Sequence, residues 1–181
     1  EAPNAVIGWV PFLVGDNFTL AKESGVTAFM HILRSESQGN IHVSSADAKQ
    51  PPAIRFNFLS AQLDRDVTLE SMRIARNIMT APALDGIVTG EIAPGADMDA
   101  DDELLQWVKE NAETTYHPVG TCKMGSDPMA VVDDQLRVHG TEGLRVADAS
   151  IMPTLTSGNT NAPSIMIGEK ASRMMLAAAQ A

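Results

Sequence analysis

Two polar loops carry the residues whose types and spacing could do chemistry. The first, residues 116–125, reads YHPVGTCKMG and places His117 directly before a proline, which restricts the backbone of His117 to extended or turn conformations. Gly120 then permits a tight turn. An imidazole fixed in such a loop is suited to accepting a proton near neutral pH. Most histidines have structural or surface roles, and we assign the other three to that class: His31, His42 and His139.

The second loop, residues 157–163, reads SGNTNAP and leads into an apolar stretch typical of a helix. Asn159 is either a simple turn residue or a side-chain amide that hydrogen-bonds a substrate hydroxyl. Asn161 is the better candidate for the helix N-cap. The N–H groups of Asn161 and Ala162 would then point outward at the positive end of the helix dipole, where an anion or a partly negative carbonyl is favoured. We expect His117 and Asn159 to face one reacting centre.

Two further polar residues have weaker patterns. Asp148 ends a predicted short strand over residues 144–147, where it is either a turn former or a ligand-binding residue at the carboxyl end of a strand. Cys122 is interpreted as a small buried residue. No cluster of metal ligands surrounds it, so no metal site is predicted.

Composition excludes several classes of partner. The net charge of -10 and the pI near 4.7 argue against binding to nucleic acid or to an anionic membrane surface. No apolar run approaches the ~18 residues of a membrane helix. The lone cysteine fits a reducing compartment, and we expect a cytoplasmic location. The 181 residues contain no G-x-G-x-x-G, so the chain either binds no nucleotide or is the C-terminal part of a larger protein, which we favour.

Hydrophobic periodicity predicts the elements that must position these loops. We expect strands over residues 26–33, 41–45 and 54–58, with the first two forming a hairpin. Helices are expected over residues 66–81, from residue 99 and from residue 161. In the first helix the predicted buried face is Val67, Ile74, Ile78 and Ala81, widened by Met72, Ala75 and Met79. The fold class is therefore α+β, an antiparallel sheet with helices on one face.

Three segments together are specific enough to suggest a family. Residues 116–125, 146–153 and 158–169 resemble the C-terminal signature of the glucose–methanol–choline (GMC) flavin oxidoreductases, nearest to the choline-dehydrogenase-like alcohol dehydrogenases. Residues 37–47 and 52–58 are similar to the substrate-domain sheet of that family. The resemblance implies a substrate-binding domain over residues 1–135. Residues 136–181 would then be a strand–loop–helix piece of an incomplete FAD-binding domain.

The resemblance also implies roles for residues. His117 matches the catalytic histidine, which takes the hydroxyl proton as hydride leaves for N5 of FAD, and Asn159 matches its partner position. Asp148 and Ala149 match the segment that touches the ribityl-pyrophosphate. The backbone of residues 160–162 (Thr160, Asn161 and Ala162) matches the segment beside the flavin pyrimidine edge.

The expected function is therefore oxidation of a primary alcohol, choline-like or other, to an aldehyde. The implied partners are a small alcohol and an absent N-terminal FAD-binding half, with membrane association only through an electron acceptor. The chain by itself is expected neither to hold FAD tightly nor to turn over. Two alternatives stay open at this point: an FAD-containing lyase on the same scaffold, and a non-catalytic binding module. The aromatic content of 4% argues mildly against a choline cage within this chain.

Overall fold

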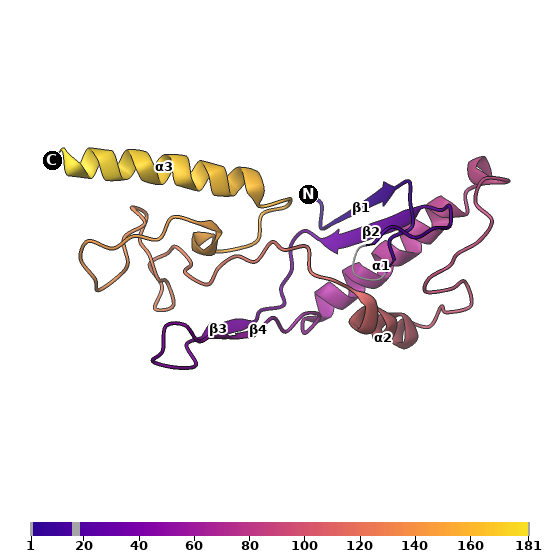
Figure 1. The fold of residues 1–181 in the computed structure, drawn as a ribbon, viewed down its shortest axis with the longest axis horizontal. Coiled ribbons are helices and arrows are strands. Elements are labelled where there is room, and N and C mark those ends of the chain that lie inside the picture. The colour runs from indigo at the N-terminus through magenta and orange to yellow at the C-terminus, as the bar shows by residue number, and fades with distance from the viewer. Residues whose placement is uncertain (1, 16–18, 181) are drawn as a thin grey trace. The chain divides into compact units, whose positions relative to one another are not determined.

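The computed structural model describes residues 2–15 and 19–180 and shows a mixed α+β chain (Figure 1). The chain divides into two compact units, residues 1–37 with 59–115 and residues 38–58 with 116–181. In sequence the units meet at residues 37 and 38, 58 and 59, and 115 and 116. The assignment of residues 1–135 and 136–181 to a substrate-binding and an FAD-binding domain stays a prediction.

The first unit is a two-stranded ribbon covered by helices. Strands β1 (Ala5–Val10) and β2 (Thr27–Ile32) pair antiparallel, with Ala5 opposite Ile32. Helix α1 (Gln62–Met79) packs along this ribbon and α2 (Asp101–Asn111) packs against α1 (Figure 1). A short 3-10 turn, η2 (Pro82–Leu84), follows α1. The buried side chains of the unit's core come from the two helices: Leu69, Met72, Leu104 and Val108.

Helix α1 begins earlier than the predicted start at Asp66, because a buried carboxylate lies in its first turn. Asp64 is 1% exposed and accepts hydrogen bonds from Ser35 Oγ at 2.6 Å and from the backbone N–H groups of Glu36 and Ser37, both at 2.9 Å. Burial acts to raise the pKa of this carboxyl, but the hydrogen bonds from residues 35–37 outweigh it and hold the pKa below its ordinary value. The carboxylate therefore ties residues 35–37 to the start of α1.

The buried face of α1 was only partly predicted. Val67, Met72 and Ala75 are buried as expected, but Ile74 and Ile78 are 41% and 43% exposed. The buried face turns toward α2, where Leu104 and Val108 are buried, and toward β1 and β2. The spacing of apolar residues predicts that a helix has an apolar face. The neighbouring elements determine which part of a broad apolar face is buried.

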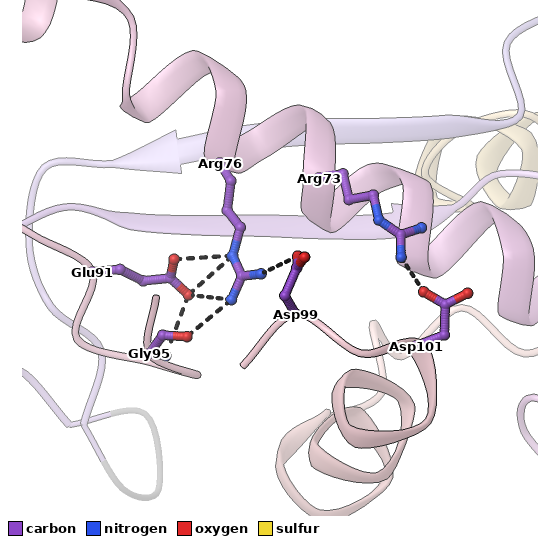
Figure 2. Close-up of polar contacts among 6 residues, drawn as sticks. All are labelled: Arg73, Arg76, Glu91, Gly95, Asp99 and Asp101. Atoms are coloured by element: carbon purple, nitrogen blue, oxygen red, sulfur yellow. Dashed lines mark hydrogen bonds and ion pairs between the residues drawn. The ribbon is translucent and has the colours of Figure 1, made fainter. Parts of the chain in front are cut away.

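A single arginine holds the irregular segment between the two helices (Figure 2). Arg76 of α1 donates from Nε and Nη2 to the Glu91 carboxylate, each at 2.9 Å, and from Nη2 to the Gly95 carbonyl oxygen at 3.1 Å. Its Nη1 lies 3.7 Å from Asp99 Oδ1. One turn away, Arg73 pairs with Asp101 at the start of α2. These contacts fasten residues 91–101 along α1.

The second unit contains a short hairpin, long loops and the C-terminal helix. Strand β3 (Asn40–His42) pairs antiparallel with β4 (Ala53–Arg55), a 3-10 turn η3 covers Ala149–Ile151, and α3 covers Asn161–Ala179. Its core is a set of buried apolar side chains: Val132, Leu136, Ile151, Met152, Ile167 and Ala171. The core joins α3 to the loops that precede it.

The strand pairing corrects two predictions. The strand at residues 27–32 pairs with β1 and not with residues 41–45, so the predicted hairpin is wrong and the described strands form two separate ribbons, not one sheet. The strand predicted over residues 54–58 is β4 at Ala53–Arg55, which is short and exposed throughout. Partners distant in sequence, β1 in particular, determine these pairings, and local alternation does not identify them.

The predicted strand at residues 144–147 is reduced to one isolated antiparallel bridge between Arg137 and Arg145. The segment is held by single hydrogen bonds, including Val146 N–H to the Leu136 carbonyl oxygen at 3.1 Å. Asp148 therefore follows a bridged loop, and not the end of a sheet strand. Among the described residues, no helix is long and apolar enough to cross a membrane.

Candidate active site

The loop that carries His117 is shaped by two residues with positive φ. Tyr116 has φ 58° and Gly120 has φ 87°, so the chain turns on both sides of the His117–Pro118 pair. Farther along, the Cys122 N–H donates to the Ser150 carbonyl oxygen at 3.0 Å. His117 is half-buried, and its loop is hydrogen-bonded to the η3 segment.

The structure brings His117 and Asn159 together. The amide nitrogen Nδ2 of Asn159 lies 2.9 Å from Nε2 of the imidazole. On the other side of the ring, Oγ1 of Thr160 lies 2.9 Å from Nδ1. Asn159 is exposed and Thr160 is 7% exposed, so one edge of the ring faces outward and the other faces the interior of the unit.

Helix α3 presents its N-terminus beside this pair. The N-cap is Thr160, and Asn161 is the first helical residue, so Asn161 is not the N-cap that we expected. The N–H groups of the first turn of a helix have no intrahelical acceptor, and those of Asn161 and Ala162 remain available because both residues are exposed. The positive end of the α3 dipole thus lies next to the imidazole and the amide.

Asp148 and Ala149 occupy a different loop. The Asp148 carboxylate caps η3 by accepting the Ser150 N–H at 2.8 Å and the Ser150 hydroxyl. The same segment supports the histidine loop, because the Met124 N–H donates to the Ile151 carbonyl oxygen at 2.8 Å. Contact of Asp148 and Ala149 with a cofactor stays a prediction.

Sequence reasoning missed the side chain of Thr160, for which only the backbone was considered. A partial signal was present, because Pro163 lies three residues later and removes one of the two N–H groups that a threonine N-cap ordinarily binds. Within residues 2–15 and 19–180 there is no group of three or more His, Cys, Asp or Glu side chains that could hold a metal ion.

These parts define the chemistry available at the site. A ring nitrogen can accept a proton, an amide N–H can hold the oxygen from which the proton leaves, and a helix N-terminus can stabilise nearby negative charge. This set suits removal of a proton from a hydroxyl beside an electron-accepting group.

Comparison with known proteins shows the family. The family model described as GMC oxidoreductase matches residues 35–168, which include both site loops. The chain belongs to the GMC oxidoreductases. Two similar proteins are oxygen-dependent choline dehydrogenases. The one from Cronobacter sakazakii is 48% identical to this chain over 169 residues, and the one from Pseudomonas syringae pv. tomato is 47% identical over 171 residues. The matches cover 93% and 94% of this chain but 30% of each relative, so the chain spans about a third of their length.

Solved structures of similar proteins have the same fold over this region. Pyridoxine 4-oxidase from Mesorbium loti is 30% identical with a TM-score of 0.85, and the match covers 94% of this chain and 34% of that one. An Aspergillus oryzae RIB40 formate oxidase variant, studied for FAD modification, is 27% identical with a TM-score of 0.86, covering 97% and 32%. A fungal aryl-alcohol oxidase is 27% identical with a TM-score of 0.76, covering 89% and 27%.

GMC oxidoreductases use FAD, and one end of such a cofactor fits the residues present. The backbone N–H groups of the exposed residues Asn161 and Ala162 suit the pyrimidine edge of a flavin, where negative charge gathers on reduction. The nucleotide end finds no glycine-rich phosphate-binding turn in these 181 residues. The residues of this chain therefore suit the flavin ring, the reacting end of FAD, and not its nucleotide end.

Proposed function

We propose that this chain is the C-terminal portion of an FAD-dependent alcohol oxidoreductase that converts a primary alcohol into an aldehyde, with His117 as the base. The 2.9 Å contact between Asn159 Nδ2 and His117 Nε2 carries the proposal. It places a proton acceptor and a hydroxyl-binding amide at one point, beside the N-terminus of α3.

In the proposed reaction the substrate hydroxyl replaces the direct contact between these two side chains and hydrogen-bonds to both. The oxygen accepts a hydrogen bond from the Asn159 amide, and the O–H group donates to Nε2 of His117. The O–H bond then breaks and its proton moves to Nε2. A C–H bond of the carbon that bears the hydroxyl breaks as well, and the carbonyl forms. FAD, when bound, accepts the hydride that leaves this carbon.

The remaining site residues would bind the cofactor. The N–H groups of Asn161 and Ala162, with Thr160 before them, would lie along the pyrimidine edge of the flavin. Asp148 and Ala149 would approach its ribityl-pyrophosphate. The phosphate-binding turn would come from an N-terminal half outside this chain, which agrees with the 30% coverage of the choline dehydrogenases.

The substrate class is a small primary alcohol. Identity of 48% with oxygen-dependent choline dehydrogenase supports a choline-like substrate. The similar solved structures also include a pyridoxine 4-oxidase and an aryl-alcohol oxidase, so the proposed class covers primary alcohols of different shapes.

The test uses the complete protein that contains this chain. Choline, benzyl alcohol and pyridoxine are each added without oxygen, and the flavin absorbance is followed. Bleaching by any of them, with the matching aldehyde as product, supports the proposal. A flavin that stays oxidised while a cyanohydrin is cleaved would instead make the protein a lyase, and a protein that binds alcohols without flavin would be a binding module.

A further inference from the structure

His117 has a partner at each of its two ring nitrogens. Nε2 lies 2.9 Å from Asn159 Nδ2, and Nδ1 lies 2.9 Å from Thr160 Oγ1. The two partners are neighbours in sequence but differ in what they can do. A side-chain amide nitrogen only donates hydrogen bonds, whereas a hydroxyl both donates and accepts.

This difference determines where the imidazole proton lies. Because Asn159 Nδ2 donates, Nε2 of His117 accepts and carries no hydrogen. In a neutral imidazole the hydrogen is then on Nδ1, which donates to Thr160 Oγ1. The lone pair of the ring faces Asn159, where the substrate hydroxyl is proposed to bind.

Thr160 is placed for this contact by an unusual helix start. A threonine at the N-cap ordinarily accepts a hydrogen bond from the N–H of the second or third helical residue. Here the third helical residue is Pro163, which has no N–H, and the Thr160 side chain makes no capping hydrogen bond. Its backbone is helical, with φ −85° and ψ −3°, instead of the extended conformation typical of an N-cap.

The rest of Thr160 is held rigidly. Its carbonyl oxygen accepts from the Ser164 hydroxyl at 2.6 Å and from the Ser164 N–H at 3.0 Å. The residue is 7% exposed, so water has little access to compete for the hydroxyl. A fixed, buried hydroxyl directed at Nδ1 restricts the orientation of the ring and gives an Nδ1 hydrogen an acceptor that water would not readily replace.

We propose that Thr160 is a positioning residue that stabilises the Nδ1–H tautomer of His117, because its side-chain hydroxyl accepts the Nδ1 hydrogen while the Asn159 amide donates to Nε2. The inference rests on the proposed function, in which Nε2 receives the substrate proton. With the opposite tautomer Nε2 would already carry a hydrogen, and the ring could not act as a base toward the alcohol. The hydroxyl also continues to accept Nδ1–H after Nε2 has been protonated.

The direct test is the tautomer of His117, measured by ¹⁵N long-range correlation NMR on the complete protein labelled with [¹⁵N]histidine. The His117 signals are assigned by their loss in His117→Gln. In the unmutated protein we expect a protonated Nδ1 and an unprotonated Nε2. Thr160→Val should shift the ring toward the Nε2–H form, whereas Thr160→Ser, which keeps the hydroxyl, should retain the Nδ1–H form.

Thr141→Val is the matched control, because Thr141 is exposed in a turn of the same unit. It should leave the His117 signals unchanged. A proton on Nε2 in the unmutated protein would overturn the inference, since the Asn159 amide oxygen would then face the ring and Thr160 would donate. An unchanged tautomer in Thr160→Val, or the same loss in Thr160→Ser as in the valine variant, would also overturn it.

A kinetic readout separates this inference from the proposed function. In Thr160→Val we expect kcat for alcohol oxidation to fall by up to about 10²-fold, with KM nearly unchanged and kcat restored in Thr160→Ser. An unchanged kcat in the valine variant would overturn the inference. The spectrum is recorded without substrate, so it decides the role of Thr160 even if the unmutated protein oxidises no alcohol, a result that would end the proposed function alone.

Discussion

Nδ2 of Asn159 lies 2.9 Å from Nε2 of His117, although 42 positions separate the two residues in the chain. One comes from a loop bounded by two residues with positive φ, and the other from the loop that starts α3. Within this unit the two loops meet at the N-terminus of the helix. That meeting point is the basis of the proposed alcohol oxidation.

Removing the amide should weaken catalysis moderately. Asn159→Ala removes one hydrogen bond to the substrate oxygen, so we expect kcat/KM to fall roughly 2- to 10-fold, as a loss of about 0.5–1.5 kcal/mol implies. Steady-state kinetics with the best primary alcohol measure this. Asn111→Ala, which alters an amide at the end of α2, is the control and should have no effect. An unchanged kcat/KM in Asn159→Ala would reduce Asn159 to a loop residue.

The buried Asp64 should make stability depend on pH. Its folded-state pKa is lowered from 3.8, so its contribution is present above about pH 4 and is lost as the pH falls through the folded-state pKa. Asp64→Asn should therefore cost about 1–3 kcal/mol at pH 7 and less at pH 3, measured by denaturant unfolding.

The control for this prediction is Asp66→Asn, since Asp66 is exposed and accepts a hydrogen bond from Nε2 of Gln62, in the same helix, at 2.7 Å. That variant should be close to neutral at both pH values. An equal loss of stability for Asp64→Asn at pH 7 and at pH 3 would show that ionisation of the carboxyl is not what stabilises the fold.

We predict that the contacts of Arg76 protect residues 91–99 from amide hydrogen exchange. Arg76→Ala removes the hydrogen bonds to Glu91 and Gly95, so amide hydrogen exchange over residues 91–99 should become faster. Arg173→Ala is the control, because it removes an exposed ion pair with Glu169 on α3. Mass spectrometry of the exchanged protein measures both. Equal protection of residues 91–99 with and without Arg76 would rule out this fastening.

The 181-residue chain by itself should not retain FAD. It offers the reacting end of a flavin a helix N-terminus, but it has no glycine-rich turn for the pyrophosphate. After incubation with FAD and desalting, the chain should carry far less than one flavin per molecule, while the complete protein serves as the positive control. Stoichiometric flavin absorbance in the desalted chain would contradict this.

Local signals in the sequence predicted the helices better than the sheets. Helices were expected from residues 99 and 161, and the structure has them at residues 101–111 and 161–179. The partner of the strand at residues 27–32 was not expected, because β1 lies well before it in a segment rich in glycine and proline. Similarly, the burial of Asp64 depends on residues 35–37, which no helical pattern includes.

The site was predicted from residue types, and its supports were not. His117 and Asn159 were chosen for their loop settings and for a family resemblance, and the structure places them in contact. The contact of the Thr160 hydroxyl with the ring needed coordinates, because the usual role of such a threonine is to cap its own helix. Asp148 turned out to cap a 3-10 turn after a bridged loop, since residues 144–147 find only a single bridging partner.

The most direct measurement is the rate of flavin reduction by a primary alcohol in the absence of oxygen, compared between the complete protein and His117→Ala. We predict that the alcohol bleaches the flavin and that His117→Ala slows this step by about 10²- to 10⁴-fold, the usual worth of a positioned base. His42→Ala, which alters an exposed histidine of β3, should reduce at the normal rate. Flavin reduction that is equally fast without the His117 imidazole would contradict the account.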